Sequence, residues 1–411
     1  MRVAYVTMQF PAPAETFATT DVRTLRSFGV HVDVYTLKPA HDHHMRLLHE
    51  RGLADLTVRS MTVGRALRGL ASLLWPRRAT VRWLAWVLRH TWRRPRHLVK
   101  CCALIPGAMA IAADLRREGY DVVHLFWGHF PALVGKLVRL QRSSPQLTMF
   151  LGAYDLQEGF GPSRALAQRA DAVVTHARAN LAAIAGMGVA PESVHVIYRG
   201  VPLAEVDRGR PESEAARHPR RLLVVARLIP SKRVDAAIRA FGQLASRWPD
   251  AALAILGDGP SRSALMVLVE ALGLNDRVEF HGHVPHHEVL ARMWAAAGFV
   301  LLSTKDGERL PNVVKEAMAC GCVPVVAVTP GIEELVEDGV TGWIVPASSH
   351  DVVADRVERV LRGGPEIEAM RAAGRRVIER RFDARRSMQA YVSVWRDDDC
   401  LHSCARPNEL S

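Results

Sequence analysis

Cysteine is scarce in this sequence, because the 411 residues contain only six. They fall as a neighbouring pair, as a Cys-Gly-Cys turn and as a pair near the C-terminus: Cys101, Cys102, Cys320, Cys322, Cys400 and Cys404. None of these has the two-plus-two spacing of a zinc site. We therefore expect reduced thiols in a cytosolic protein.

Long hydrophobic runs are also missing. The longest, residues 101–113, is interrupted by Pro106 and is shorter than the roughly 20 residues that span a bilayer. The opening MRVAYVTM has one Arg, a short apolar run rich in β-branched residues and no small-residue cleavage site, so it predicts a first strand rather than a signal peptide. No transmembrane helix is expected.

Residues 65–100 contain no acidic residue and ten Lys or Arg residues. This segment therefore carries ten of the twelve formal net positive charges of the chain. The cations alternate with Trp75, Trp83, Trp86 and Trp92. Aromatic, cationic helices of this kind lie on anionic membrane surfaces, so we predict peripheral attachment to the inner membrane face. The alternative is a helical insertion whose tryptophans pack on the first domain. A nucleic-acid partner is not expected, because no recognisable binding motif is present.

Hydrophobic residues make up 49% of the sequence and charged residues 23%, which is typical of a globular protein. The length of 411 residues fits two domains of ordinary size. Apolar runs rich in β-branched residues alternate with segments of helical period, which predicts parallel sheets covered on both faces. We expect two doubly wound α/β domains facing each other across a cleft. Their expected ranges are 1–204 with an inserted basic segment near 65–100, a charged linker at 205–221, a second domain at 222–378, a crossover helix at 379–396 and a polar tail at 397–411.

Ligands of such sheets bind at the carboxyl ends of the strands, so chemistry is expected in the loops there. One loop, ARLIPSKR, carries Arg227 and Lys232 ahead of a helix, where cations and free backbone N–H groups favour anionic oxygens. A solvated surface pair is the alternative. The next loop, GDGP, places Gly257 where the backbone can approach a ligand closely.

Two glutamates stand eight positions apart in DGERLPNVVKEAMACG, Glu308 in a loop and Glu316 inside a short helix that Pro311 begins and Gly321 ends. A carboxylate accepts two hydrogen bonds at once, and adjacent sugar hydroxyls offer two donors at a matching separation. Acids that only favour the helix dipole are the alternative. Together with the cations, the two acids describe a nucleotide-sugar pocket.

These motifs resemble the retaining glycosyltransferases of family 4, which have the GT-B fold, over nearly the whole chain. The E-x7-E signature is met by Glu308 and Glu316, with Leu310, Pro311 and Asn312 between them, and the R-x4-K pair by Arg227 and Lys232. GHVP and GIEELVEDGVTG also match. In the first half, QFPAPAETF is similar to the FP-x-x-S-E-T-F loop of the exopolysaccharide branch, with Ala14 in place of Ser.

The resemblance implies roles for these residues. Arg227 and Lys232 would hold the donor diphosphate and stabilise it as it leaves. Glu316 would bind the ribose hydroxyls, and Glu308 the donor sugar. Further donor-binding residues would be Gly257, Leu310, Pro311 and Asn312. Transfer would retain the anomeric configuration without a protein nucleophile, a metal or another cofactor. The one Asp-x-Asp, Asp397 with Asp399, lies in the polar tail and is expected to be solvated.

The first domain departs from the family pattern at its histidines. Where the family often has His-x-His, this chain has His124 with Phe126, and His129 is a candidate replacement. Where the family usually has His-Gly ahead of an Asp, this chain has Leu151-Gly152 ahead of Asp155. We assign a catalytic role to His124 and an acceptor-side role to Glu15, Thr16, His129 and Asp155.

The sequence thus predicts an enzyme that moves a sugar from a nucleoside diphosphate to a glycan, a lipid-linked acceptor or a small molecule. One alternative is a noncatalytic scaffold of the same fold that binds membranes or partners through residues 65–100. Another is a phosphorylase or epimerase. The base, the donor sugar, the acceptor and the oligomeric state are left open by the sequence.

Overall fold

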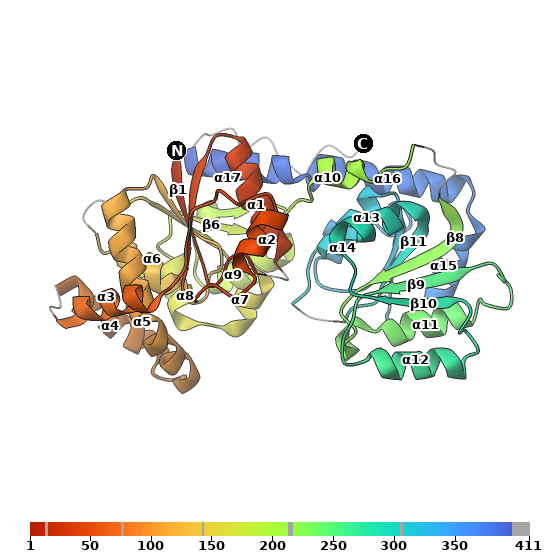
Figure 1. Cartoon of the computed structure of the whole chain (residues 1–411), viewed down its shortest axis with the longest axis horizontal. Helices are drawn as coiled ribbons and strands as arrows, with labels where there is room; N and C mark the ends of the chain where they lie inside the picture. Colours follow the sequence, from red (N-terminus) through yellow and green to blue (C-terminus); the bar gives the residue numbers. More distant parts are fainter. Residues whose placement is uncertain (13–14, 75–77, 142–143, 213–216, 305–306, 397–411) are drawn as a thin grey trace. The chain divides into compact units, whose positions relative to one another are not determined.

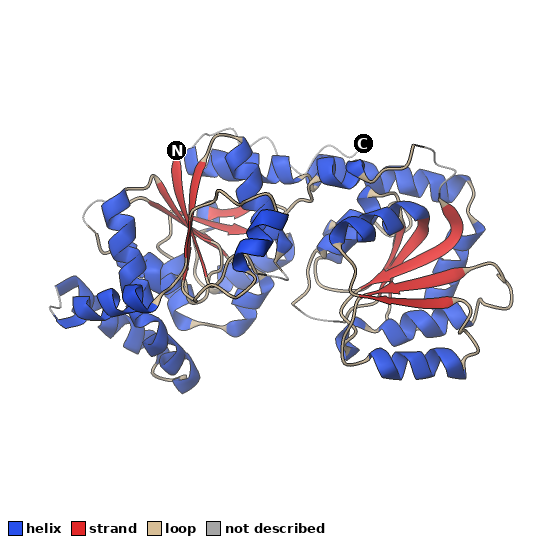
Figure 2. Cartoon of the chain, viewed as in Figure 1, coloured by secondary structure: helices blue, strands red, loops and turns tan. Residues whose placement is uncertain are grey.

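The computed structural model describes residues 1–12, 15–74, 78–141, 144–212, 217–304 and 307–396. The chain forms two compact units, Met1–Arg199 together with Ala384–Ser411 (unit 1), and Gly200–Asp383 (unit 2). Each unit contains one parallel sheet with helices on both of its faces (Figures 1 and 2). The prediction of two doubly wound α/β domains is therefore confirmed.

Unit 1 has a seven-stranded sheet in the order β3-β2-β1-β4-β5-β6-β7. Its strands are β1 (Arg2–Thr7), β2 (His31–Thr36), β3 (Val58–Arg59), β4 (Val122–Leu125), β5 (Gln146–Phe150), β6 (Ala172–Thr175) and β7 (Val194–Val196). The strand order reverses between β1 and β4, where Tyr5 lies opposite His124. Loops that follow these two strands meet at the carboxyl edge of the sheet, which is where doubly wound folds bind ligands.

The helices of unit 1 cover both faces of this sheet. They are α1 (Thr16–Ser27), α2 (His44–Glu50), α3 (Val63–Leu74), α4 (Arg78–Thr91), α5 (Pro95–Glu118), α6 (Ala132–Val138), α7 (Ala153–Glu158), α8 (Gly161–Ala167), α9 (Leu181–Gly186) and α17 (Ala384–Arg396), with 3-10 turns η1 (Arg178–Asn180) and η2 (Pro191–Ser193). Helix α17 packs on α1 and buries Met388, Tyr391, Val394 and Trp395 in the unit 1 core.

The basic segment forms α3, α4 and the first half of α5, which project from one side of the sheet (Figure 1). Its tryptophans divide between the two expected roles. Trp83 is buried and donates its Nε1–H to the carbonyl of Leu133 at 3.0 Å, whereas Trp92 is 59% exposed. Trp75 lies outside the described residues.

Pro106 interrupts the apolar run in the sequence but does not end a helix. It lies inside α5, which is 24 residues long. Gly69 of α3 lies against the Pro106 carbonyl so closely that a Cβ there would be 1.9 Å from the oxygen, so the two helices pack at this point. By length and composition alone α5 is long and apolar enough to cross a membrane, and half of its most apolar window is buried inside the structure. The core helix of a globular protein can have the same length and composition, so these two properties of α5 do not by themselves indicate a membrane span.

Unit 2 has a six-stranded sheet in the order β10-β9-β8-β11-β12-β13. Its strands are β8 (His218–Val225), β9 (Ala252–Leu256), β10 (Val278–Gly282), β11 (Ala296–Leu301), β12 (Val323–Ala327) and β13 (Trp343–Val345). Its helices are α10 (Leu203–Arg208), α11 (Val234–Gly242), α12 (Arg262–Ala271), α13 (His286–Ala295), α14 (Asn312–Ala319), α15 (His350–Arg362) and α16 (Pro365–Arg381), with 3-10 turns η4 (Pro230–Lys232) and η5 (Ile332–Glu334). Here the order reverses between β8 and β11.

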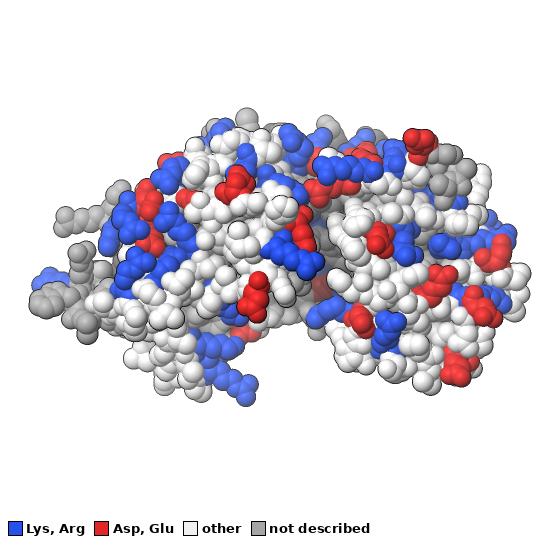
Figure 3. All heavy atoms as spheres, in the orientation of Figure 1, with Lys and Arg blue, Asp and Glu red and all other residues white. Residues whose placement is uncertain are grey.

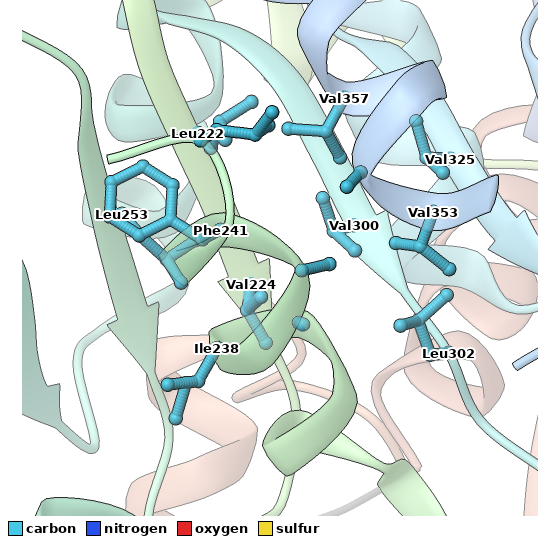
Figure 4. Packing of buried hydrophobic residues seen from close by; sticks show 14 of the residues in the cluster. Leu222, Val224, Ile238, Phe241, Leu253, Val300, Leu302, Val325, Val353 and Val357 are labelled. Carbon is cyan, nitrogen blue, oxygen red and sulfur yellow. The ribbon is translucent and has the colours of Figure 1, made fainter. Parts of the chain in front are cut away.

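The core of unit 2 forms between this sheet and the helices that cover it. Figure 4 shows Ile238 and Phe241 of α11 and Val353 and Val357 of α15 packed beside side chains of the central strands. Because both faces of these strands are buried, their sequences are continuous apolar runs, as the sequence pattern predicted.

The boundary between the domains falls earlier than predicted, at Arg199 and Gly200 instead of within 205–221. The charged segment belongs to unit 2, because Arg375 of α16 pairs with Asp207 of α10 at 2.8 Å and Trp294 donates to the Val206 carbonyl at 2.9 Å. The predicted crossover helix is likewise divided, since α16 ends at Arg381 and α17 begins at Ala384. The charged composition suggested a linker, but Asp207 and Arg220 of this segment form ion pairs with Arg375 and Asp250 of unit 2.

Candidate functional site

Three loops at the carboxyl edge of the unit 2 sheet are joined by backbone hydrogen bonds. Leu228 N donates to Asp258 O at 2.9 Å, and Gly257 N donates to Gly282 O at 2.7 Å. Gly257 has a φ of 128°, and a Cβ at this position would lie 1.9 Å from the Ala226 carbonyl oxygen. Only glycine fits here, and its role in the structure is to bring the loops after β8 and β9 together.

Lys232 and Glu308 meet where the strand order of unit 2 reverses. The Lys232 ammonium donates to both Glu308 carboxylate oxygens, at 2.7 and 2.6 Å, and the Ser303 hydroxyl donates to the same carboxylate. The two charged side chains are 12% and 19% exposed. A charge pair that is this well coordinated yet still reachable can bind a polar ligand at low reorganisation cost.

The loops that carry this pair are held together by their main chains. Thr304 N, after β11, donates to Ser231 O, after β8, at 2.9 Å. Arg227, at the start of the same β8 loop, is exposed, and its guanidinium makes no ion pair with any residue that the structure describes. A cation without an internal partner at a strand end is available to an anion.

Helix α14 presents Glu316, and it begins one residue after Pro311, the predicted first residue. Pro311 is the N-cap and Leu310 before it is buried, while Gly321 after the helix has a φ of 76°. Glu316 Oε1 is hydrogen-bonded to His286 Nε2 at 3.0 Å, and the Glu316 side chain is 14% exposed. Sequence reasoning missed His286, although it directly follows the GHVP motif.

Asn312 serves the interior of unit 2 through its side chain. Its Oδ1 accepts from Lys315 Nζ at 3.0 Å, and Lys315 is fully buried with its ammonium 5.4 Å from the centre of the Phe382 ring. The Asn312 side chain therefore fixes the first turn of α14, and this support orients the helix that carries Glu316.

A second polar group lies at the carboxyl edge of the unit 1 sheet. Asp155 is completely buried in its side chain and accepts from His129 Nδ1 at 2.8 Å, from His129 N at 3.0 Å and from Gly152 N at 3.0 Å. Because Asp155 holds Nδ1, the Nε2 atom of His129 is the one left for a ligand. That His129 takes the place of a family histidine stays a prediction, and this arrangement leaves its Nε2 atom for that role.

Glu15 belongs to the same edge, at the start of α1. The Trp127 indole donates to its carboxylate at 3.3 Å. Burial raises the pKa of Glu15, and the Trp127 hydrogen bond with the charges of Arg199 and His129 opposes that rise. Thr16 is exposed, and its carbonyl accepts from the Thr19 and Thr20 hydroxyls. Three of the four predicted acceptor-side residues thus interact through bonds or charge.

His124 is not part of this edge, and its predicted catalytic role is not supported by its position. The ring is 1% exposed, lies under α17 and has its centroid 5.3 Å from that of Tyr391. Burial lowers the pKa of His124 to about 3. A neutral, enclosed imidazole within β4 packs the core and does not reach a substrate.

Metal ligands do not mark another site in the described part of the chain, and the Cys320-Gly-Cys322 turn does not mark one either. No group of three or more His, Cys, Asp and Glu side chains there could hold a metal ion. Cys320 and Cys322 are buried, and burial raises the pKa of the Cys322 thiol to about 11. Asp397 and Asp399 lie outside the described residues.

Comparison with protein families matches both halves of the chain. Residues 14–205 match the model described as Glycosyltransferase Family 4, and residues 206–377 match that described as Glycosyl transferases group 1. The change from one to the other falls close to the boundary between the units.

Similar proteins include two curated relatives. A putative colanic acid biosynthesis glycosyltransferase, WcaL of Salmonella typhimurium, is 28% identical over 88% of this chain and 91% of its own length. An exopolysaccharide phosphotransferase of Streptomyces coelicolor is 37% identical, but the match covers 34% of this chain and only 15% of that protein.

Among solved structures, HepE of Anabaena in complex with UDP superposes with a TM-score of 0.72 at 18% identity, covering 97% of this chain and 100% of HepE. Identity this low shows the fold alone. Both halves of the chain match glycosyltransferase models, and its two Rossmann-like units have the GT-B fold of known structures, so the chain is a glycosyltransferase of the GT-B type.

Proposed function

We propose that this protein transfers a sugar from a nucleoside diphosphate donor to a glycan, a lipid-linked acceptor or a small molecule, with retention and without a metal. The observation that carries the proposal is the Lys232–Glu308 pair at the reversal point of the unit 2 sheet. Doubly wound sheets bind nucleotides at this point. The complex of HepE with UDP, a protein of the same fold, supports a nucleoside diphosphate.

The pair divides the work on the donor. An ammonium has three hydrogens, and Lys232 gives hydrogen bonds to both oxygens of Glu308, which leaves one for a phosphate oxygen. Arg227 adds a second cation. Negative charge grows on the diphosphate as the glycosidic bond to it breaks, so fixed cations stabilise the transition state more than the bound donor. The remaining lone pairs of Glu308 accept from donor sugar hydroxyls.

Glu316 binds the ribose in this proposal. Its carboxylate is partly exposed and held from one side by His286, so its free oxygen can accept from adjacent ribose hydroxyls. His286 is then a positioning residue for Glu316.

The strand-end group of unit 1 receives the acceptor. His129, held through Nδ1 by buried Asp155, offers Nε2 to a hydroxyl, and Glu15 adds a carboxylate with a raised pKa. The attack occurs on the face from which the diphosphate departs, so the hydroxyl proton passes to a leaving-group oxygen and needs no protein nucleophile.

We further propose that the enzyme works in exopolysaccharide synthesis, as a cytoplasmic protein held at the inner membrane face. The WcaL relative is named for colanic acid biosynthesis. The outer faces of α3, α4 and the start of α5 combine cations with apolar side chains that face water: Val63, Leu67, Leu70, Val81, Leu88, Trp92 and Val99 are each 45–78% exposed. An anionic bilayer is the partner that accepts both kinds of side chain.

The test is a panel of nucleoside diphosphates and their sugars, read by thermal shift and by slow hydrolysis of the donor. Glu316→Ala should weaken every ribonucleotide about tenfold or more, as the loss of a charge-assisted hydrogen bond does. Glu308→Ala should leave binding of the free nucleoside diphosphate within about threefold but abolish turnover of the sugar donor.

Glu334→Ala, on η5 of the same unit, is a control for the loss of an acidic side chain. If both glutamate variants lost free nucleotide to the same extent, the division of roles would be wrong. If no nucleotide stabilised the wild-type protein, the proposed donor would be wrong, and a noncatalytic scaffold would be favoured.

A further inference from the structure

A basic cavity of about 500 Å³ lies at the edge of the unit 1 sheet. The segment after β2, the edge strand β3, helix α3 and the C-terminal end of α5 line it, with Ala40, His44, Val58, Arg59, Ser60, Thr62, Arg65, Arg68, Asp114 and Arg117. It shares no residue with either strand-end group described above. Nothing in the glycosyl transfer reaction explains it.

Cations outnumber acids in this cavity. Arg65 donates to Asp114 at 2.6 Å and Arg117 donates to the other oxygen of Asp114 at 2.9 Å, so one carboxylate serves two guanidinium groups. Arg59 pairs with Glu118 at 3.1 Å, outside the lining. Figure 3 shows Lys and Arg side chains gathered, with fewer acids among them, on the side of unit 1 from which α3–α5 project.

Arg68 provides the cation that internal pairing does not use. It is exposed on α3, and it forms no ion pair with the residues that the structure describes. Positive charge therefore remains at the mouth of the cavity after the acids have been matched, and the local field attracts anions.

Three lining residues also carry buried polar atoms that have no hydrogen-bond partner within the described part of the chain. They are His44 Nδ1, Arg59 Nε and Ser60 Oγ. A buried polar atom without a partner costs about 1–3 kcal/mol, so such atoms are rare and several beside one cavity need an explanation. Arg59 Nε–H and the Ser60 hydroxyl are donors on residues that line the cavity but lie just beneath its surface, so a small side-chain rotation would turn them towards a ligand that brings several acceptors.

We propose that this cavity binds a phosphoryl group. Phosphoryl oxygens are acceptors only, they carry negative charge, and arginine matches their geometry. An anionic lipid headgroup and a free phosphate present the same chemistry. The lipid source fits the position of the cavity, because the exposed apolar side chains Val63, Leu67 and Leu70 stand on the same helix as Arg65 and Arg68.

The first experiment measures inorganic phosphate and inorganic diphosphate by titration calorimetry at constant ionic strength. The background is Arg227→Gln with Lys232→Gln, so that the proposed donor site does not contribute. Arg68→Gln should weaken binding about tenfold, since it removes a charged partner of the anion. Arg116→Gln is the matched control, because Arg116 is an exposed arginine of α5 that does not line the cavity.

Ser60→Ala separates ligand binding from structure and from overall charge. Its hydroxyl is buried without a partner, so removal should leave the thermal midpoint unchanged or slightly raised. Phosphate binding should nevertheless fall about threefold to tenfold. A variant that only disturbed the fold would lower both together.

The second experiment uses the wild-type chain and the same single variants with vesicles of phosphatidylcholine, with or without phosphatidylglycerol. If Ser60→Ala weakens the binding to phosphatidylglycerol vesicles as well, the ligand is a lipid headgroup. If it weakens only the binding of soluble phosphate, the ligand is a free phosphate. If Arg68→Gln and Ser60→Ala match Arg116→Gln in both experiments, the proposal is overturned, whatever the nucleotide panel shows.

Discussion

His124 illustrates how a motif residue can be present for packing. Trp395 of α17 donates its Nε1–H to the Thr148 hydroxyl at 3.1 Å, and that hydroxyl lies 2.8 Å from His124 Nδ1. The hydroxyl can then give its own hydrogen to Nδ1, which fixes a neutral imidazole with its proton on Nε2. This chain of bonds ties β4 and β5 to the last helix of unit 1.

The buried imidazole should make unit 1 sensitive to acid. The folded-state pKa of His124 is about 3, below the ordinary value of about 6.5. Between these two pH values His124 is protonated in the unfolded chain and neutral in the folded protein. Stability is complete above about pH 6.5 and falls by up to about 1.4 kcal/mol per pH unit as the pH drops towards 3. His124→Asn should flatten this part of the dependence, as measured by urea-unfolding midpoints at stepped pH.

His218→Asn is the control for that experiment, because His218 is exposed at the start of β8. A dependence on pH that is equally steep in His124→Asn and in the wild-type protein would show that other groups set the acid response.

Single residues of the proposed donor site were predictable, but their pairing was not. Glu308, Glu316, Arg227 and Lys232 stand in motifs that the sequence displays. The direct bond between Lys232 and Glu308 joins positions 76 residues apart, and it depends on the strand order of the sheet. His286 was missed for the same reason, since its contact with Glu316 exists only after α13 and α14 pack together.

Helices α3 and α4 carry a surface whose composition was visible in the sequence and whose orientation was not. Leu67 and Leu70 could have faced the domain, yet α3 turns Arg65 and Gly69 inwards instead, to Asp114 and to the Pro106 carbonyl. The close approach at Gly69 and the buried ion pair together decide which face remains in water.

Replacing the exposed leucines should therefore detach the protein from anionic membranes. In the double variant Leu67→Asn with Leu70→Asn, sedimentation with phosphatidylglycerol vesicles should fall about tenfold or more. Burying one leucine side chain in the bilayer contributes about 1.5–3 kcal/mol to binding, and each substitution removes a large part of that free energy. The thermal midpoint should not fall, since both side chains are exposed, at 58% and 45%.

Met266→Asn with Val267→Asn provides the matched control on α12 of unit 2, where the side chains are 49% and 64% exposed. Equal loss of sedimentation in the two double variants would mean that exposed apolar area acts without regard to place, and the attachment surface would be withdrawn.

The two units differ in how the chain builds them. Unit 2 is one continuous segment, Gly200–Asp383, whereas unit 1 needs α17 from the end of the chain. Val201 N donates to Phe382 O at 2.8 Å, so the two ends of unit 2 lie side by side. Apolar patterning predicted both sheets, but it could not show that the charged segment 205–221 belongs to the second of them.

Residues 200–383 should consequently fold alone. Expressed as a fragment, they should unfold cooperatively on heating and retain binding of nucleoside diphosphates, because the core and the Lys232–Glu308 pair are internal to this unit. Residues 1–383, which lack α17, should keep a folded unit 2 but an incomplete unit 1 core. Calorimetry of both fragments checks this, and a fragment 200–383 without a thermal transition would contradict it.

The adjacent ends of unit 2 carry a consequence for the order of events on the ribosome. Unit 2 can finish folding once Asp383 has emerged, whereas the aromatic cluster around Tyr5 and His124 must wait for Tyr391 and Trp395. The half of the protein that is made first is thus completed last. Until then the cluster lacks the rings of α17 that cover it in the folded protein.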